Sequence, residues 1–364
     1  MNLLVDLGHP AHLHFFKNMI RNLEKDGSEV QITARDKDTL IQLLNYYNFS
    51  YSAVGGHEKG FLGKSVNMLK RDFGILRIAR RKKSDLFIGL HNPYTVHVAK
   101  LLGKQSITFT DTENVGLASA ITFPFTDAIC TPQCFREKID ERKHVRFNGY
   151  KELAYLHPKY FKPDPAVLEE LGLDKKSKFS VLRFISWSAS HDTRLKGIAK
   201  GSETGFIEKL KEYGEVFITS ERELGNDLER YRVRIHPSKM HSLLSYAQLY
   251  IGEGGTMAAE AAVLGTPSIH IESLRSGVAS GEMSGNFLEL RDKYGLLYMF
   301  PDSASALKKA SQVLGMKNPK GEWMKRRDRM LEEKVDVTKW MTNFVGNYPQ
   351  SFNDYKEEVG ARAL

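Results

Sequence analysis

Residues 249–267 read LYIGEGGTMAAEAAVLGTP and place a strand, a turn and a helix in one short stretch. The apolar run 249–251 predicts a buried strand, and the three glycines around it predict a tight turn that a ligand can approach closely. The small residues from Thr256 onward predict a helix, which ends at Gly265 before a proline. Such a strand–turn–helix unit is typical of a parallel sheet covered by helices.

The start of this predicted helix is suited to an anion. Its first N–H groups have no partner within the helix, and its dipole is positive at that end. Gly254, Gly255 and Thr256 would surround the anion, and Glu260 lies one turn further, on a face that can turn toward the same ligand. A carboxylate there can accept hydrogen bonds from two hydroxyl groups, such as those of a ribose. The stretch matches neither GxxxxGK[ST] nor GxGxxG, and the alternative interpretation is a helix cap with an exposed Glu260.

The same alternation of strands and helices runs through the whole chain. In the first half, apolar runs predict strands at 3–7, 30–33, 86–90, 107–110, 128–130 and 145–147. After a proline-rich stretch at 157–165, strands are predicted at 179–185, 216–219, 233–235, 249–251, 268–271 and 297–300, with helices at 206–213, 240–247, 257–264 and 304–314. We therefore expect an N-terminal Rossmann-like domain over 1–160, a C-terminal Rossmann-like domain over 161–335 and a helical tail over 336–364. The fold class is α/β, with two doubly wound domains facing a cleft and a C-terminal helix packing back on the domains.

Composition excludes several classes of protein. With 41% hydrophobic and 27% charged residues, the 364-residue chain is globular rather than disordered or fibrous. No apolar run is long enough for a transmembrane helix, and the first residues do not resemble a signal peptide. Two cysteines cannot form a disulfide framework and indicate a reducing, cytoplasmic compartment. The net charge of +9 suits an anionic partner such as a nucleotide, a phosphate or an anionic membrane face.

The glycine turn with Glu260 resembles the donor-binding segment of GT-B enzymes, which include UDP-N-acetylglucosamine 2-epimerases and the N-acetylglucosaminyltransferases of cell-wall synthesis. The overall order of motifs resembles an uncharacterised, largely archaeal family of predicted GT-B glycosyltransferases. The resemblance implies that the glycine turn holds a nucleotide diphosphate and that Glu260 binds the ribose hydroxyls. It also implies a nucleotide sugar as a substrate and no separate cofactor.

The loop after the first predicted strand contains the candidate catalytic residues. Gly8 lets the backbone turn, and His9, His12 and His14 follow it. Histidine is suited to proton transfer near neutral pH. In the GT-B resemblance Gly8 belongs to the first glycine loop, and His12 falls where transferases of the cell-wall type carry a loop histidine; His9 is the second choice. A metal site remains an alternative, but only Asp6 would add a carboxylate, so we expect no metal.

Carboxylates at the end of a later strand are further candidates. Asp111 and Glu113 alternate after the strand at 107–110 and would project to one side, as a general base or as ligands of sugar hydroxyls. The resemblance to the epimerases matches Glu113 to their cleft glutamate. His91 and Asn92 stand where those enzymes keep a Gly-Asp pair, so a carboxylate that epimerisation needs is missing. This favours glycosyl transfer over epimerisation.

The second half offers further candidates for donor binding. Arg183 lies in an apolar strand, where a guanidinium needs an acidic partner or a phosphate. Ser188 and His191 follow in a serine-rich turn that the resemblance places at the donor phosphates. His236 borders the nucleotide base in the same resemblance, and Arg275 could reach the diphosphate or the sugar.

We therefore expect a glycosyltransferase that uses a nucleotide-diphosphate sugar, with a UDP-sugar favoured, in polysaccharide or glycoconjugate synthesis. His12, with Glu113 or Asp111 nearby, would deprotonate the acceptor, which is unknown and could be lipid-linked. A UDP-N-acetylglucosamine 2-epimerase or hydrolase and a non-enzymatic sugar-nucleotide-binding protein remain alternatives. The basic run 77–83 leaves open whether the protein makes peripheral contact with the inner face of a membrane. The residues around this run do not indicate nucleic-acid binding. The sequence leaves the oligomeric state open.

Overall fold

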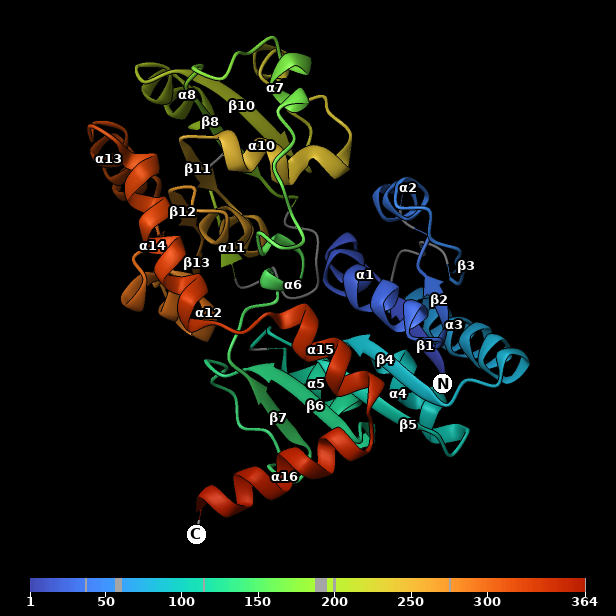
Figure 1. Ribbon diagram of the computed structural model, residues 1–364. Coiled ribbons are helices and arrows are strands. Elements are labelled where there is room, and N and C mark those ends of the chain that lie inside the picture. Colours follow the sequence, from blue (N-terminus) through green and yellow to red (C-terminus); the bar gives the residue numbers. More distant parts are fainter. Residues whose placement is uncertain are drawn as a thin grey trace. The chain divides into compact units, whose positions relative to one another are not determined.

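The apolar runs of the first half of the chain form one parallel sheet of seven strands (Figure 1). The computed structural model describes residues 1–36, 38–55, 61–113, 115–186, 195–198, 201–274 and 276–363. The strands follow the order β3-β2-β1-β4-β5-β6-β7 across the sheet. Their bounds are β1 (Asn2–Leu7), β2 (Glu29–Ala34), β3 (Ser52–Ala53), β4 (Leu86–Leu90), β5 (Gln105–Phe109), β6 (Ala128–Pro132) and β7 (His144–Phe147).

Helices that bury aromatic and aliphatic side chains pack on this sheet. Leu4 and Phe87 pack with α3 and α4, while Phe109 contacts Phe15 and Phe16 of α1. Burial of such side chains stabilises the fold by roughly 1.5–3 kcal/mol each. The elements are α1 (Pro10–Lys25), α2 (Asp38–Tyr46), α3 (Phe61–Lys82), α4 (Pro93–Leu101), α5 (Gly116–Thr122), η1 (Phe123–Phe125) and α6 (Leu153–Leu156).

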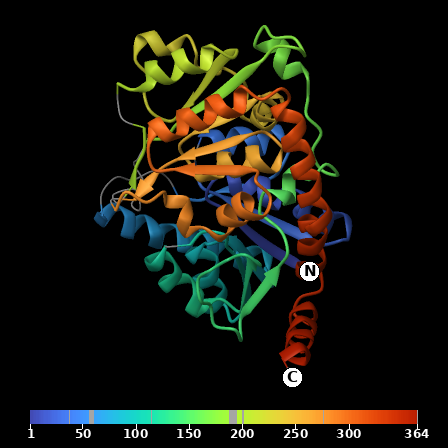
Figure 2. The same cartoon turned by 90° about the vertical axis from the view of Figure 1, so that its left-hand side faces the viewer.

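The C-terminal tail completes this first unit. In α15 (Val337–Gly346), the Trp340 ring lies 4.8 Å from the Phe147 ring and 6.5 Å from the Phe109 ring, between centroids. The tail ends in α16 (Gln350–Ala363), which leads to the C-terminal end (Figure 2). The expected packing of a C-terminal helix back on the protein is therefore confirmed.

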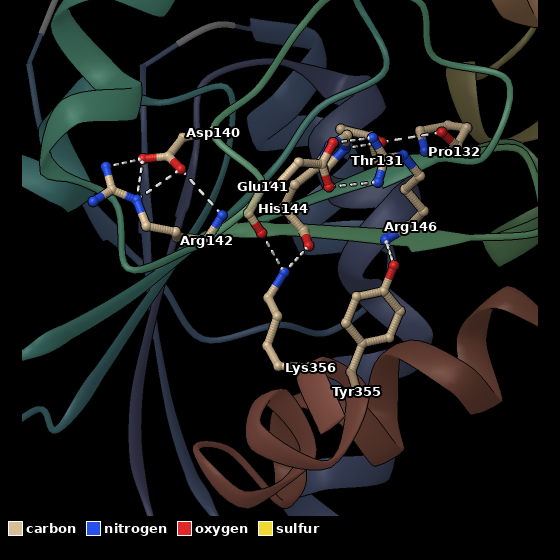
Figure 3. Close-up of polar contacts among 9 residues, drawn as sticks. All are labelled: Thr131, Pro132, Asp140, Glu141, Arg142, His144, Arg146, Tyr355 and Lys356. Atoms are coloured by element: carbon tan, nitrogen blue, oxygen red, sulfur yellow. Dashed lines mark hydrogen bonds and ion pairs between the residues drawn. The ribbon is translucent and has the colours of Figure 1, made fainter. Parts of the chain in front are cut away.

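Polar contacts attach α16 to β7 (Figure 3). The backbone N–H of Arg146 donates to the Tyr355 hydroxyl at 3.0 Å, and Lys356 Nζ donates to the carbonyl oxygens of Glu141 and His144. His144 is buried and shares a 2.8 Å hydrogen bond with Thr131. Burial, assisted by the nearby Arg146 charge, lowers the pKa of His144 to about 4, so this ring is neutral near neutral pH.

The second half forms a separate parallel sheet in the order β10-β8-β11-β12-β14. Its strands are β8 (Phe179–Phe184), β10 (Glu215–Ser220), β11 (Leu249–Gly252), β12 (Ser268–Ile271) and β14 (Leu297–Phe300), and β9 (Leu195–Lys196) pairs antiparallel with β13 (Ser273–Leu274). The helices are α7 (Ala166–Glu170), α8 (Glu203–Lys211), α9 (Asn226–Glu229), η3 (Pro237–Lys239), α10 (Met240–Tyr246), α11 (Gly255–Val263), η4 (Ser280–Met283), α12 (Gly285–Leu288), η5 (Glu289–Lys293), α13 (Ser303–Leu314) and α14 (Pro319–Glu333).

The chain divides into two compact units. Unit 1 comprises Met1–Tyr155 and Val335–Leu364, and unit 2 comprises Leu156–Lys334. Sequence analysis predicted the boundaries between domains at 160–161 and 335–336. No described helix is both long enough and apolar enough to cross a membrane.

Two details of the predicted strands are wrong. Residues 233–235 form no strand, because only Arg232 makes an isolated bridge, to Ile218, before the chain enters η3. The two-residue strands β3, β9 and β13 were not predicted, because two residues are too few for an apolar alternation.

Strand order locates a candidate site in each unit. In unit 1 the order reverses between β1 and β4, and in unit 2 it reverses between β8 and β11. Ligands of open parallel sheets bind at the carboxyl ends of the strands that flank such a reversal. The relevant loops are therefore those after β1 and β4 in unit 1 and those after β8 and β11 in unit 2.

Candidate active site

The glycine turn after β11 has the geometry that its sequence predicts. Gly254 has φ of 85°, a conformation that favours glycine. A Cβ atom on Gly252 would lie 2.5 Å from the Arg183 carbonyl oxygen, so only glycine lets β11 and β8 approach this closely. Gly255 then begins α11. Gly252 and Gly254 thus fix the direction of the turn, and Gly255 marks the start of the helix.

The first turn of α11 is open to a ligand. Gly254 occupies the N-cap position and, as a glycine, has no side chain that could cap the helix. Thr256 in the first turn is exposed. N–H groups at an uncapped helix start, together with the helix dipole, attract anions. Gly254, Gly255 and Thr256 thus lie where the sequence predicts an anion site.

Glu260 lies on the buried side of the same helix and has a partner that sequence analysis did not find. Its side chain is 8% exposed, and Oε1 lies 3.0 Å from Nε2 of His241. The partner comes from α10, which packs against α11. The interpretation of Glu260 as an exposed residue beside a helix cap is therefore wrong.

Glu253, between the glycines, organises the neighbouring loop. It is completely buried, and its carboxylate accepts hydrogen bonds from the backbone N–H groups of Ile185 at 2.8 Å and Ile198 at 2.6 Å. The chain on both sides of residues 186–197 is thus tied to the glycine turn. A carboxylate flanked by glycines at the end of an apolar strand was the available sequence signal.

Arg183 also lies beside the glycine turn. A Cβ atom on Gly254 would be 3.6 Å from Nε of Arg183. The guanidinium forms an ion pair with Glu221, which follows β10, so the acidic partner that a strand arginine requires is present. Because Glu221 offsets its charge, Arg183 can serve the anion site as a hydrogen-bond donor rather than as a net positive charge.

Of the other donor-binding candidates in unit 2, the structure describes only His236. His236 caps η3 by accepting a hydrogen bond from Ser238 N, and its Nδ1 lies 2.8 Å from the Ser238 hydroxyl. Ser188, His191 and Arg275 lie outside the described residues.

In unit 1, the loop after β1 holds Gly8 and His9, and His12 follows in the first turn of α1. His9 is the N-cap of α1 and accepts from Ala11 N at 3.2 Å, which is a structural role. Gly8 N donates to Nδ1 of His12 at 3.3 Å. Because Nδ1 accepts a hydrogen bond, the neutral His12 ring carries its proton on Nε2. The ring centroids of His9 and His12 are 6.2 Å apart.

A buried polar network underlies this loop. Asp6, at 0% exposure, forms two contacts of 2.7 and 2.8 Å with Arg71 Nη2, while Thr33 donates to it at 2.7 Å. Asn92 Nδ2 donates to the second carboxylate oxygen of Asp6, and Asn92 Oδ1 accepts from Tyr94 N at the start of α4. The network thus joins the two strands, β1 and β4, that flank the reversal of strand order.

His91, which precedes Asn92, has an unusual backbone. Its φ of 44° is rare for a residue other than glycine and is often found at functional sites. Its Nδ1 lies 2.8 Å from the Thr110 hydroxyl, and its Nε2 lies 3.3 Å from the Ser119 hydroxyl. Burial lowers the pKa of His91, although the charge of Asp111 acts in the opposite direction.

The candidate carboxylates Asp111 and Glu113 have separate partners. β5 ends at Phe109, so both lie in a loop and the expected strand alternation does not apply to them. Asp111 pairs with Lys151 at 2.8 Å, and both side chains are 10% exposed. Glu113 accepts a hydrogen bond from Arg136 N at 3.2 Å. Lys151, which also lies 3.6 Å from Glu152, was not predicted because it is distant in sequence.

No group of three or more potential metal ligands occurs among the residues that the structure describes. Asp6, which the metal alternative required, is instead committed to Arg71, Thr33 and Asn92.

Comparison with known protein families shows to which family the chain belongs. Residues 1–275 match the family described as protein of unknown function (DUF354). The chain belongs to this family. An uncharacterized protein of Methanocaldococcus jannaschii, MJ0665, is 28% identical over 284 residues, which cover 74% of this chain and 81% of that protein. The resemblance to an uncharacterised family with archaeal members is thus confirmed.

Solved structures with the same fold are enzymes that act on sugar nucleotides or transfer sugars. The UDP-GlcNAc 2-epimerase of Methanocaldococcus jannaschii has a TM-score of 0.63 at 17% identity, covering 91% of this chain and 99% of that one. The Streptomyces sp. SF2575 glycosyltransferase SsfS6, complexed with thymidine diphosphate, has a TM-score of 0.59 at 13% identity, covering 95% and 99%. These likenesses confirm the predicted GT-B-like fold class. At such identities they establish the fold alone.

Proposed function

We propose that the protein is a glycosyltransferase and that unit 2 binds its nucleotide-diphosphate sugar donor at the start of α11. The observation that carries the proposal is the uncapped turn of Gly254 and Gly255, with Glu260 buried one turn further in the helix. The helix start would hold the diphosphate, and Arg183 would donate a hydrogen bond to it. The complex of SsfS6 with thymidine diphosphate supports a diphosphate ligand for this fold.

Glu260 would bind the ribose hydroxyls of the donor. A carboxylate has about four lone-pair positions, and the contact with His241 uses one of them. His241 also holds the carboxylate in one orientation, which reduces the entropy lost on binding. This arrangement favours a ribonucleotide such as UDP.

Unit 1 would supply the proton chemistry. The acceptor hydroxyl oxygen forms a bond to the anomeric carbon of the sugar, and the bond from that carbon to the diphosphate breaks. The proton of the acceptor passes to Nδ1 of His12, which gives up the 3.3 Å hydrogen bond from Gly8. That bond is longer than the usual range of about 2.7–3.2 Å, so its loss costs little. Asp111 and Glu113 are the alternative bases, and His9 is the next choice after them. The nature of the acceptor, including whether it is lipid-linked, stays a prediction.

Transfer is favoured over epimerisation by the surroundings of Asn92. This residue stands where the epimerases keep a carboxylate, and its amide is bound on both sides, to Asp6 and to Tyr94 N. An amide also cannot take a proton from a sugar carbon. The epimerase fold match keeps epimerisation as the second candidate function.

The assignment of Glu260 predicts a loss of ribose recognition on mutation. Glu260→Ala should weaken UDP binding by about 10- to 150-fold, because hydrogen bonds to a charged group contribute about 1.5–3 kcal/mol. Wild type should bind UDP more tightly than 2′-deoxy-UDP, and the variant should bind the two equally. Titration calorimetry measures both affinities.

Two further variants control this experiment. Glu260→Gln keeps an acceptor for His241 and tests the same role if the alanine variant is unstable. Glu332→Ala removes an exposed carboxylate from α14 and should leave both affinities unchanged. Equal preference for UDP and 2′-deoxy-UDP in the wild type would refute the ribose assignment.

The choice between transfer and epimerisation predicts the behaviour of the sugar C2 proton. Incubation with UDP-N-acetylglucosamine in heavy water should give no deuterium at C2, because no carboxylate stands at position 92 to remove that proton. Mass spectrometry of the recovered nucleotide sugar measures this, with the Methanocaldococcus jannaschii epimerase as positive control. Steady incorporation would replace transfer by epimerisation and leave the donor site unaffected.

A further inference from the structure

One face of α3 exposes an aromatic side chain among cations. Lys70, Phe73, Arg77, Arg80 and Arg81 are all exposed, and Phe73 is 72% exposed. Spacings of three and four residues place these side chains along one side of the helix. They are called the basic face of α3 below. A phenylalanine this exposed does not gain the free energy that burial of its ring would give.

The basic face carries a net positive charge. The helix contains seven Lys and Arg residues and only one acidic residue, Asp72. Arg71, a buried cation of the same helix, is neutralised by Asp6, and the Asp72 carboxylate lies 3.7 Å from the His97 ring of α4. The acidic charge near the helix is thus directed away from the basic face.

The cations also line a pocket. It has a volume of about 390 Å³, and Lys70, Arg77 and Arg81 line it together with Val54 and Gly55 beside β3. Three cations around one concave surface suit a phosphate group. All residues that line the pocket belong to unit 1.

A further exposed apolar side chain lies on the helix that packs against α3. Leu101 at the end of α4 is 67% exposed, and α4 packs against α3. Apolar side chains amid cations match the interface of an anionic bilayer, where rings enter the headgroup region and cations contact phosphates. Aliphatic Leu101 cannot stack on a base, which disfavours nucleic acid.

We propose that the basic face of α3 binds the surface of an anionic membrane, with Phe73 inserted among the headgroups and Lys70, Arg77 and Arg81 around a lipid phosphate. The proposal is independent of the donor site, so its failure would leave the proposed function untouched.

Vesicle binding tests this proposal. The full chain should sediment with vesicles of phosphatidylcholine mixed with phosphatidylglycerol, and not with phosphatidylcholine alone. Arg77→Gln combined with Arg81→Gln should weaken binding about 30-fold, because each cation at an anionic surface strengthens binding about fivefold. Phe73→Ser should weaken it about tenfold, and this loss should persist at high ionic strength.

A charge-matched variant is the control. Lys308→Gln combined with Lys317→Gln removes two exposed cations from unit 2 and should bind vesicles like the wild type. An equal loss in this control would show a response to net charge only and overturn the proposal. Binding to neutral vesicles as strong as to anionic ones, or displacement from vesicles by RNA at equal phosphate concentration, would also overturn it.

Discussion

Arg71→Met should lower the free energy of unfolding of unit 1 by about 3–5 kcal/mol, the usual cost of breaking a buried ion pair by removing one partner. Asp6 is completely buried and Arg71 is 4% exposed, so the variant leaves a carboxylate in the core without its countercharge. Thr33 and Asn92 still donate to Asp6, but two neutral donors stabilise a buried carboxylate less than they do together with a guanidinium.

The measurement must separate the two units. Because a two-unit chain need not unfold in one step, hydrogen exchange in increasing urea, read on peptides that cover β1 and β4, reports unit 1 by itself. Arg71→Met combined with Asp6→Asn removes both charges and should be less destabilised than the single variant. Arg77→Met, on the exposed side of the same helix, should change stability by less than about 0.5 kcal/mol. A loss under about 1 kcal/mol in Arg71→Met, as for exposed ion pairs, would contradict the assigned network.

The fold could be predicted because its signals are local. Buried parallel strands are short apolar runs, and nearly all the predicted runs became strands. The run 233–235 failed because a strand also needs a partner along its length. There the chain makes hydrogen bonds only around Ile218 before Pro237 redirects it into η3. The apolar pattern of one segment contains no information about the strand with which it would pair.

The site could be predicted only as a set of loops. Glycine positions and strand ends identified the turn at 252–256 and the loop at 8–12, and strand order places both at reversals. The partners of the predicted side chains could not be found, because they are distant in sequence. His241 pairs with Glu260 and Lys151 with Asp111 only through the fold.

Arg71 is an instructive case, because its signal was present. It precedes Ile75 and Ala79 at helical spacing, so a charge occupied the apolar side of a helical pattern. Such a residue requires a buried acidic partner, and Asp6 at the end of an apolar strand was the matching charge. Neither position identifies the pair by itself.

His12→Asn should lower turnover by about 10² to 10⁴, the usual contribution of general-base catalysis. Asparagine suits the test because its side-chain oxygen lies close to the position of Nδ1. It can therefore accept the hydrogen bond from Gly8 N, which keeps the loop in place, but it has no basic nitrogen. The donor site lies on unit 2, so donor affinity should survive the change.

The experiment needs kcat with an acceptor found by screening for UDP release, together with donor Kd by calorimetry. In the wild type, kcat/KM should fall on the acidic side as His12 becomes protonated, and the variant should lack that limb. Full turnover in His12→Asn would transfer the base role to Asp111 or Glu113, which separate Asp111→Asn and Glu113→Gln variants distinguish. If His12→Asn loses turnover although kcat/KM of the wild type does not fall at acidic pH, His12 would instead act as a hydrogen-bond donor through Nε2. The hydrogen bond from Gly8 N selects the tautomer that carries its proton on Nε2.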